Sequence, residues 1–407
     1  MSGGTAGVRL DQLLDRWFDE HRHDLIGLRR DLHAHPELSG DEHRSTATVT
    51  ALLDAAACVT RPMSVGTGVI ADLAPGARSG TGHAGRIAFR ADLDALAMHD
   101  QKPVTYRSTI DGVSHSCGHD VHTTVVVGAA QFLAAHRDLL SSPVRFLFQP
   151  AEERVPGGAL DVIRDGGLDD VATVVGLHCE PKLDVGSVGL RAGAITSAAD
   201  MFTVTIRGPG GHTARPELTV DTVALAARVV TELPPRVAAA TADAGVKVVF
   251  GAVHGGDAAN AIPTSVVLRA TARTPSLAAW EPLRDTVATA LDDLLVGTGA
   301  EIELDYTQGV PPTVNDSSVI GRLRRAAEQV VGVGGVVEAE QSWGGDDFAW
   351  MTREVPGAYV RLGVHDPSGP TLDLHAGHFD VDERSIEIGV RLLVTTACAP
   401  VFPPTGS

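Results

Sequence analysis

The chain has 407 residues, of which 43% are hydrophobic and 21% charged, so it is long enough for two domains and has a globular composition. Its formal net charge of −18 argues against nucleic acid or an anionic membrane as a partner, because both require clustered Lys and Arg. No stretch approaches the ~20 apolar residues of a membrane span and the N-terminus lacks a signal-peptide pattern, so we expect a cytoplasmic protein.

The first part of the chain alternates short apolar runs with helical patterns. Strands are predicted at Arg86–Ala91, Val144–Phe148 and Thr173–Gly176, because these runs are short and rich in β-branched or aromatic residues. A packed helix is predicted at Val121–His136, between the first two strands. This alternation indicates an α/β sheet with helices on its faces.

After Ser197 the pattern changes to a β-α-β-β-α-β order, which is typical of a small split-βαβ domain. Residues 198–310 are therefore predicted to form an inserted domain that divides the first fold into residues 1–197 and 311–407. The predicted elements of the insertion are Met201–Ile206, a helix near Val220–Leu233, strands near Lys247–Val253 and Thr264–Arg273, a long helix over Leu277–Leu295 and the strand Glu301–Tyr306. Those after it are a helix at Ser317–Val331, a strand near Tyr359–Leu362 and a terminal helix from Arg384.

Unusual polar clusters follow the predicted strands of the outer segments, where open α/β sheets place their sites. Five side chains in these clusters supply a thiolate, imidazoles and a carboxylate: Cys117, His119, Glu153, His178 and His375. Such a set exceeds what one tetrahedral zinc needs. Two metals that share a ligand and a water would use all five, with a thiolate or a carboxylate as the shared ligand.

Glu152 and Glu153 are adjacent carboxylates at the end of a predicted strand. One can bind metal while its neighbour takes a proton from a water that the metal activates. On a solvated helix such a pair carries no meaning, but the apolar run VRFLFQPA before it favours function. Asp92 and Asp94 either hold the second nitrogen of ligand histidines or cap a loop.

Cys117 is either a metal ligand or a buried structural cysteine. His119, two positions further on, favours the ligand, as does the predicted helix, whose N-terminus would lower the thiol pKa. The four cysteines show no paired spacing, which fits a reducing compartment. Four other histidines either brace the pocket or are ordinary core or surface residues: His33, His35, His115 and His122.

Several motifs occur together in one order along nearly the whole chain: RRDLHAHPELSGDE (29–42), ADLDAL (91–96), HSCGHDVH (115–122), FQPAEE (148–153), GLHCEP (176–181), GGHTARP (210–216), NAIPTSVVLRATART (260–274) and LHAGHFDVDE (374–383). They resemble the aminoacylase and carboxypeptidase-type metallo-amidohydrolases. The similarity is to the branch of hippurate hydrolase and the plant indole-acetyl-amino acid (auxin conjugate) hydrolases.

The resemblance implies an α/β fold with a metallo-exopeptidase-like α/β/α catalytic domain and an inserted ferredoxin-like α+β domain, which serves as lid and dimerisation domain. It implies two divalent metal ions per chain, Zn²⁺ or Mn²⁺ with Co²⁺ or Ni²⁺ as further options, and it assigns the same five ligands. It makes Glu152 the general base. His212 of the GGH motif would polarise the scissile carbonyl, while Asn260 and Arg273 would hold the substrate carboxylate.

The implied activity is hydrolysis of the amide bond of a small N-acyl amino acid, such as a hippurate, an N-acetyl amino acid or an auxin conjugate, by a homodimer. Action on small peptides, as a dipeptidase or aminoacylase, is an alternative within the superfamily. A non-catalytic metal-binding scaffold is an alternative from another class, although a scaffold has no use for Glu152. Three positions depart from the family pattern without touching the ligand set: Asp346 for a usual Glu, Ala97 for a common proline and Glu217 for a frequent His.

Overall fold

The computed structural model describes residues 4–76, 85–242 and 244–399. The chain separates into two compact units. The first comprises Met1–Gly193, Val314–Glu340 and Trp350–Ser407, and the second comprises Ala194–Thr313 and Gln341–Ala349. The limits expected for the insertion, residues 198 and 310, fall a few residues inside the second unit, and no sequence pattern indicates that 341–349 joins it.

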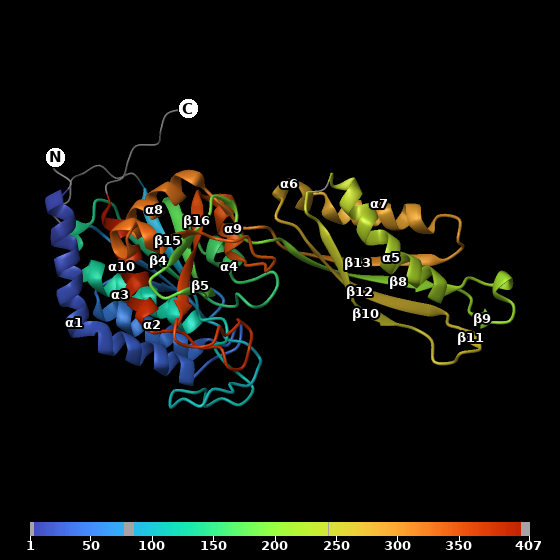
Figure 1. Ribbon diagram of the computed structural model, residues 1–407, viewed down its shortest axis with the longest axis horizontal. Helices are drawn as coiled ribbons and strands as arrows, with labels where there is room; N and C mark the ends of the chain where they lie inside the picture. The colour runs from blue at the N-terminus through green and yellow to red at the C-terminus, as the bar shows by residue number, and fades with distance from the viewer. Residues whose placement is uncertain (1–3, 77–84, 243, 400–407) are drawn as a thin grey trace. The chain divides into compact units, whose positions relative to one another are not determined.

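The first unit is built on a mixed β-sheet (Figure 1). Its strands lie in the order β1 (Val59–Pro62), β2 (Val69–Leu73), β4 (Val144–Gln149), β3 (Arg86–Asp92), β5 (Val171–Asp184), β16 (Gly357–His365), β6 (Val188–Leu190) and β15 (Val336–Glu338). The pairs β4–β3, β3–β5 and β5–β16 are all parallel. The carboxyl ends of these four strands therefore meet at one edge of the sheet.

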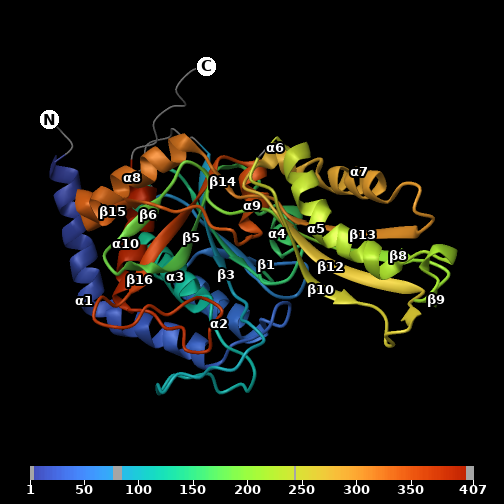
Figure 2. The ribbon, with the colours of Figure 1, turned by 45° about the vertical axis from the view of Figure 1, so that its right-hand side comes forward.

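Helix α3 (His119–Ala135) is the central helix of this unit. It packs against β3 and β5 and against the helices α1 (Gly4–Ala34), α2 (His43–Ala55) and α10 (Arg384–Cys398), as Figures 1 and 2 show. Nearly all its side chains are buried, which fits a helix that is apolar on every side. A Cβ on Gly128 would lie 2.8 Å from Val390 and 3.2 Å from Leu25, so this glycine allows α1, α3 and α10 to approach closely.

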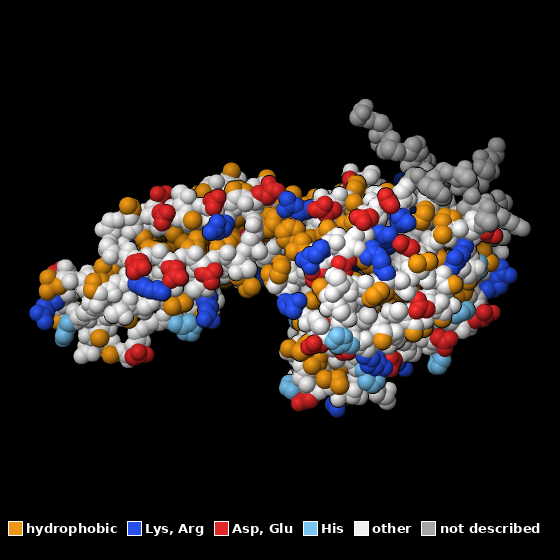
Figure 3. Space-filling view, turned by 180° about the vertical axis from the view of Figure 1, so that it is seen from behind, with side chains coloured by type: hydrophobic (Ala, Val, Ile, Leu, Met, Phe, Trp, Pro, Cys, Tyr) orange, Lys and Arg blue, Asp and Glu red, His pale blue; other side chains and the backbone are white. Residues whose placement is uncertain are grey.

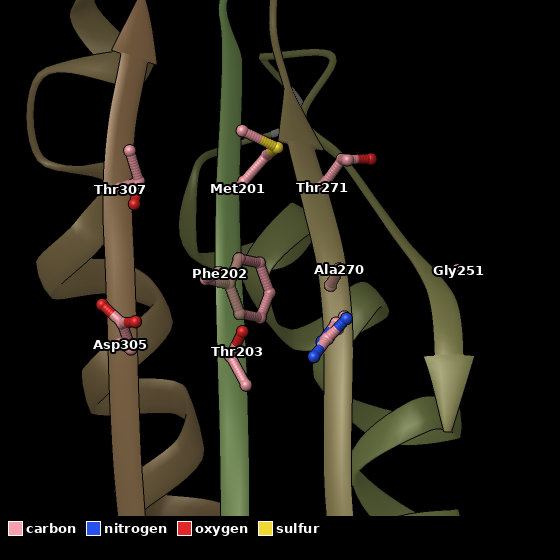
Figure 4. A pocket seen from close by; sticks show the side chains of 9 residues that line it. Met201, Phe202, Thr203, Gly251, Ala270, Thr271, Asp305 and Thr307 are labelled. Carbon is pink, nitrogen blue, oxygen red and sulfur yellow. The ribbon is translucent and has the colours of Figure 1, made fainter. Parts of the chain in front are cut away.

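The second unit contains an antiparallel sheet in the order β10 (Lys247–His254), β12 (Ser265–Arg273), β8 (Ala199–Arg207) and β13 (Glu301–Val310). Helices α5 (Thr222–Ala240) and α7 (Leu283–Leu295) pack on one face. Along β8, Phe202 is buried toward the helices while Met201 is 48% exposed. Figure 4 shows Met201, Thr203 and Thr271 around a shallow hollow on the open face of the sheet.

The predicted fold class is confirmed, since a mixed α/β sheet is combined with a small inserted antiparallel sheet. Two predicted helices are wrong in extent. The helix expected over Leu277–Leu295 is divided into α6 (Leu277–Trp280) and α7 around Pro282, which lacks the amide hydrogen that a continuous helix would use. The helix expected to end near Leu233 continues through Pro234 and Pro235, because Val237 extends its buried face.

The remaining elements are short, apart from α8. They are α4 (Ala159–Arg164), β7 (Gly193–Ala194), β9 (Gly211–His212), β11 (Ala261–Ile262), β14 (Val314–Asn315), α8 (Ser317–Val331), α9 (Phe348–Glu354) and 3₁₀ turns at Arg137–Leu139, Pro216–Leu218 and Val333–Gly335. Among the helices that the structure describes, none combines the length and apolar character that a membrane crossing needs. In each unit, acidic and basic side chains are interspersed on the face that Figure 3 presents.

Candidate metal centre

The parallel strands and the start of α3 gather the predicted ligands of the first unit. His178 lies in β5, Glu152 and Glu153 follow β4, and Cys117 and His119 stand where α3 begins. The Cys117 Sγ is 3.3 Å from the His178 Nε2, and the Glu153 Oε1 is 3.8 Å from the His119 Nε2.

His375 and Glu152 complete the group. The His375 Nε2 lies 3.4 Å from the Glu153 Oε1. The Glu152 Oε2 lies 3.9 Å from the His119 Nε2. The structure thus brings together the five side chains expected to bind metal and the one expected to act as base.

Backbone carbonyls fix the tautomers of two histidines in the centre. The Nδ1 of His119 is 2.9 Å from the Asp94 carbonyl oxygen, and the Nδ1 of His178 is 2.7 Å from the Cys179 carbonyl oxygen. A carbonyl oxygen only accepts, so in each ring Nδ1 carries the proton and donates it. Both Nε2 atoms therefore present lone pairs to the centre, as metal-ligating histidines do.

Two buried atoms show that the side chains suit a metal ion. The His119 Nε2 and the Glu153 Oε1 are both buried and have no hydrogen-bond partner among the described residues. Both can give an electron pair to a cation across the 3.8 Å that separates them, and without a metal a proton would take that place, because Asp92 and Cys117 raise the pKa of His119 although burial lowers it. This separation is about that of two donors on one ion at bond lengths of ~2.1 Å. Cys117, His119 and Glu153 together form a candidate metal group.

Burial and mutual contact shift the pKa values of this group. Burial raises the pKa of the Cys117 thiol although His119 lowers it, so the lowering expected from the helix N-terminus does not prevail. Hydrogen bonds to Cys117 and Glu153 raise the pKa of His375 to about 10. Binding of a metal must therefore displace protons from these side chains, which makes metal affinity depend on pH.

Three unusual backbone conformations aim the ligands. Gly118, between Cys117 and His119, has φ +87°, and a Cβ there would lie 2.7 Å from the Cys179 Sγ. Ala151 (φ 56°) and His375 (φ 55°) are also left-handed, which costs roughly 1 kcal/mol or more for residues with a Cβ. Hydrogen bonds hold both, since the Ala151 amide donates to the Glu42 Oε1 at 2.8 Å and the His375 amide to the Ser116 carbonyl at 2.8 Å.

Asp94, expected as the partner of a ligand histidine, contacts His119 mainly through its backbone carbonyl. Its carboxylate Oδ1 is 3.5 Å from the His119 Nδ1. The same carboxylate accepts the amide hydrogens of Glu152 at 3.1 Å and Glu153 at 2.9 Å, and the Ser39 hydroxyl at 2.7 Å. Asp94 thereby fixes the turn that carries both glutamates.

His122 belongs to a second set of contacts, which the sequence left undecided. Its Nε2 accepts the Cys179 amide hydrogen at 2.9 Å, so its Nδ1 carries a proton and donates it to the Asp92 Oδ1 at 2.7 Å. Arg90 donates to the Asp92 Oδ2 at 2.5 Å. The backbone of Cys179 is thus held at two points, because its N–H donates to His122 and its C=O accepts from His178. His122 and Asp92 lie near His119 in a candidate metal group, but both ring nitrogens of His122 are already engaged.

A buried ion network lies beside the centre. Arg29 donates to Asp120 at 2.8 Å and to Asp380 at 2.9 Å, and the His33 Nδ1 lies 2.7 Å from the same Asp120 carboxylate. His115 is buried as well, and its ring nitrogens have no hydrogen-bond partner among the described residues. Asp120, an acidic residue in the mainly apolar helix α3, was the clearest sequence sign of this network.

The other predicted site residues lie in the second unit. The His212 Nδ1 accepts the Ala214 amide hydrogen at 3.0 Å, so its Nε2 carries the proton and can donate it. His212 and Asn260 are neighbours, because β9 pairs with β11 and the Thr213 amide donates to the Asn260 carbonyl at 3.3 Å. Arg273 instead lies at the far end of β12 and donates to the Trp343 carbonyl at 2.7 Å. The length of β12 alone separates the two ends by about 27 Å.

Comparison with known proteins identifies the family of this chain. Residues 88–399 match the model of peptidase family M20/M25/M40. The chain belongs to this family. This confirms the resemblance seen in the motifs, and the M20 protein is an enzyme of the metallo-amidohydrolase type.

The matches to individual relatives extend over most of this chain. The N-acetyl-L-cysteine deacetylase of Bacillus subtilis is 34% identical over 89% of this chain and 84% of its own. The solved structure of the Bacillus subtilis YXEP protein, described as a dinuclear metal binding peptidase from the M20 family, has a TM-score of 0.81 at 30% identity, covering 93% of this chain and 98% of its own. A protein of Rhodococcus jostii named putative glutamate–cysteine ligase 2-3 is 44% identical over 91% of this chain, which spans only 46% of that protein.

Two substitutions of His122 test whether its bond to the Cys179 amide holds His178 in place. Gln can put its side-chain oxygen near the position of Nε2 and keep that bond, whereas Asn reaches only the position of Nδ1. We expect His122→Asn to weaken metal binding about 10- to 100-fold, and His122→Gln to bind metal nearly as the unchanged M20 protein does. Competition with a coloured chelator measures the affinity, and thermal unfolding verifies that both variants are folded. Equal affinities in the two folded variants would contradict the assignment.

Proposed function

We propose that this M20 protein hydrolyses the amide bond of N-acyl amino acids with two divalent metal ions, Zn²⁺ or Mn²⁺, which Cys117, His119, Glu153, His178 and His375 hold. The observation that carries the proposal is the position of a second carboxylate, Glu152, 3.9 Å from the same His119 Nε2 that faces Glu153. A metal-storing or scaffold protein has no need of that second carboxylate. The name of the Bacillus subtilis N-acetyl-L-cysteine deacetylase, an enzyme for an N-acyl amino acid, supports this substrate class.

The side chains divide the reaction among them. When bound, the two metal ions would lower the pKa of the attacking water and polarise the acyl carbonyl. Glu152 accepts the proton of the attacking water and then delivers it to the leaving amine nitrogen. His212, whose Nε2 carries the proton, donates to the carbonyl oxygen as negative charge develops there. Arg273 and Asn260 bind the carboxylate of the amino-acid part.

The length of the insertion leads us to propose a homodimer. One chain is not expected to bring Asn260 and Arg273 to the same carboxylate, because Asn260 precedes β12, Arg273 ends it, and the strand is about 27 Å long. Two chains joined through the insertion can, if His212 and Asn260 of one protomer serve the site that contains Arg273 of the other. We also propose a cytoplasmic location, since Cys58, Cys117, Cys179 and Cys398 are all free thiols.

Hydrolysis assays test the proposed function directly. We expect the metal-loaded protein to cleave N-acetyl amino acids or hippurate, to lose this activity with a chelator and to regain it with Zn²⁺ or Mn²⁺. A preference for unblocked dipeptides would favour the dipeptidase alternative. No turnover of either class by protein shown to contain two metals per chain would favour a scaffold.

The adjacent glutamates should fail in different ways. We expect Glu152→Gln to retain its metals and lose turnover by about 10²- to 10⁴-fold, because only the proton acceptor is removed. Glu153→Gln should lose bound metal as well, because a ligand is removed. Elemental analysis of both purified variants, beside their kcat values, separates the two roles. Equal metal loss in both variants would show that this division is wrong.

Mixing two inactive variants tests the exchange of His212 between protomers. His212→Ala keeps its metal centre, while Glu152→Gln keeps its insertion. After subunit exchange, hybrid dimers contain one site with both groups, so we expect recovery to about a quarter of the activity of the unchanged protein. Native mass spectrometry confirms the exchange. If hybrids form without activity, His212 acts within its own chain or takes no part in catalysis.

A further inference from the structure

Arg361 differs from the other buried cations of the first unit. Among the described residues, these cations each contact a carboxylate: Arg29 with Asp120 at 2.8 Å, Arg90 with Asp92 at 2.5 Å, Arg145 with Asp72 at 2.8 Å and Lys102 with Asp100 at 3.2 Å. Arg361 is only 6% exposed, yet within the described part of the chain its guanidinium has neither an ion pair nor a hydrogen bond. None of its guanidinium nitrogens is a fully buried atom without a partner, so they keep some contact with solvent and a ligand can reach them. A cation held this deep without a carboxylate is still unusual and requires an explanation.

The position of Arg361 supplies one. It lies in β16 directly opposite His178 in the parallel strand β5, so the two side chains project from the same face of the sheet. Tyr359, two residues earlier on that face, links them. Its ring centroid is 5.8 Å from the His178 ring and 5.4 Å from the Arg361 Cζ. The guanidinium is therefore a near neighbour of a side chain of the metal centre.

The sheet also makes room for this side chain. On its other side Arg361 is opposite Gly189 in β6, where an added Cβ would lie 3.0 Å from the Arg361 Cβ. A larger residue at Gly189 would press on the arginine stem. The glycine thus leaves room beside His178 for the long side chain of Arg361. The adjacent residues of β16, Val360 and Leu362, are apolar.

The anionic groups of the centre do not serve as its counterion. Cys117 and Glu153 face His178, His119 and His375 at 3.3–3.8 Å, and as proposed metal ligands their charge is neutralised by the ions. A cation then remains next to the place where the substrate amide binds. Arginine is suited to a carboxylate there, because its planar fork donates two parallel hydrogen bonds.

We propose that Arg361 is a specificity-determining residue that binds a carboxylate of the substrate beside the metal centre. This inference rests on the proposed amide hydrolysis and requires that its substrates carry a carboxylate within reach of the metal centre. The carboxylate can be the α-carboxylate of the amino-acid part or a second one in its side chain. Because Arg361 lies in the same unit as the metal ligands, this contact is independent of Arg273 in the insertion.

Matched substrates test the proposal. N-acetylalanine and N-acetylalaninamide differ in the α-carboxylate, and N-acetylglutamate and N-acetylglutamine differ in the side-chain carboxylate. We expect Arg361→Met to lower kcat/KM about 10- to 100-fold for the carboxylate member of one pair and to spare its amide partner. Arg361→Lys keeps the charge without the fork and should lose less. Arg324 in α8, whose side chain is 41% exposed, supplies the control, and Arg324→Met should match the unchanged protein.

The outcomes separate the two proposals. A loss confined to the carboxylate substrate, with two metals still bound, supports the role of Arg361 and shows which carboxylate it binds. An equal loss on both members of each pair, or no loss on either, overturns it while leaving amide hydrolysis intact. If the unchanged metal-loaded protein hydrolyses none of the four substrates, the proposed function fails, and the role of Arg361 fails with it.

Discussion

The ion pairs of Arg29 with Asp120 and Asp380 connect the fold to the metal centre. Arg29 is 1% exposed, and its guanidinium lies 2.8 Å from one carboxylate and 2.9 Å from the other. Asp120 directly follows His119, and Asp380 lies five residues after His375, so one cation of α1 ties together two separate ligand segments. Burial alone would raise the pKa of Asp120, but Arg29 and His33 hold it well below its usual value. Removal of Arg29 would leave the buried Asp120 with His33 as its remaining ion-pair partner, and breaking a buried ion pair typically costs about 3–5 kcal/mol.

The remaining orientation of the centre depends on the backbone of the sheet. His119 is held by a carbonyl oxygen just after β3 and His178 by one within β5, while the amides of Glu152 and Glu153 donate to Asp94. The parallel register that buries the core thus also sets the direction of the ligand atoms. A shift of one strand by one residue would exchange its two faces and remove its ligand from the group.

This dependence explains how much could be predicted from the sequence. Glu153 follows the predicted strand at Val144–Phe148, His178 comes just after the run predicted as a strand at Thr173–Gly176, and Cys117 precedes the predicted helix. Parallel strands end at one edge of a sheet, so the gathering of these three side chains was predictable. Register across distant segments was not, because alternation within β16 fixes the face of Arg361 but not its position opposite His178, 183 residues earlier in the chain. For the same reason the bond between His122 and the Cys179 amide has no sequence signature. The left-handed Ala151 and the continuation of α5 through two prolines are likewise tertiary effects.

The two units contribute different parts of the chemistry. The groups proposed to bind metal and move the proton all lie in the first unit, whereas His212 and Asn260 are exposed residues of the second, on or beside the paired strands β9 and β11. Arg361 alters this division, because it adds a substrate contact to the rigid sheet, one strand from His178. Recognition of an acidic amide would then begin at the metal centre itself, and the insertion would add contacts to a substrate that is already oriented.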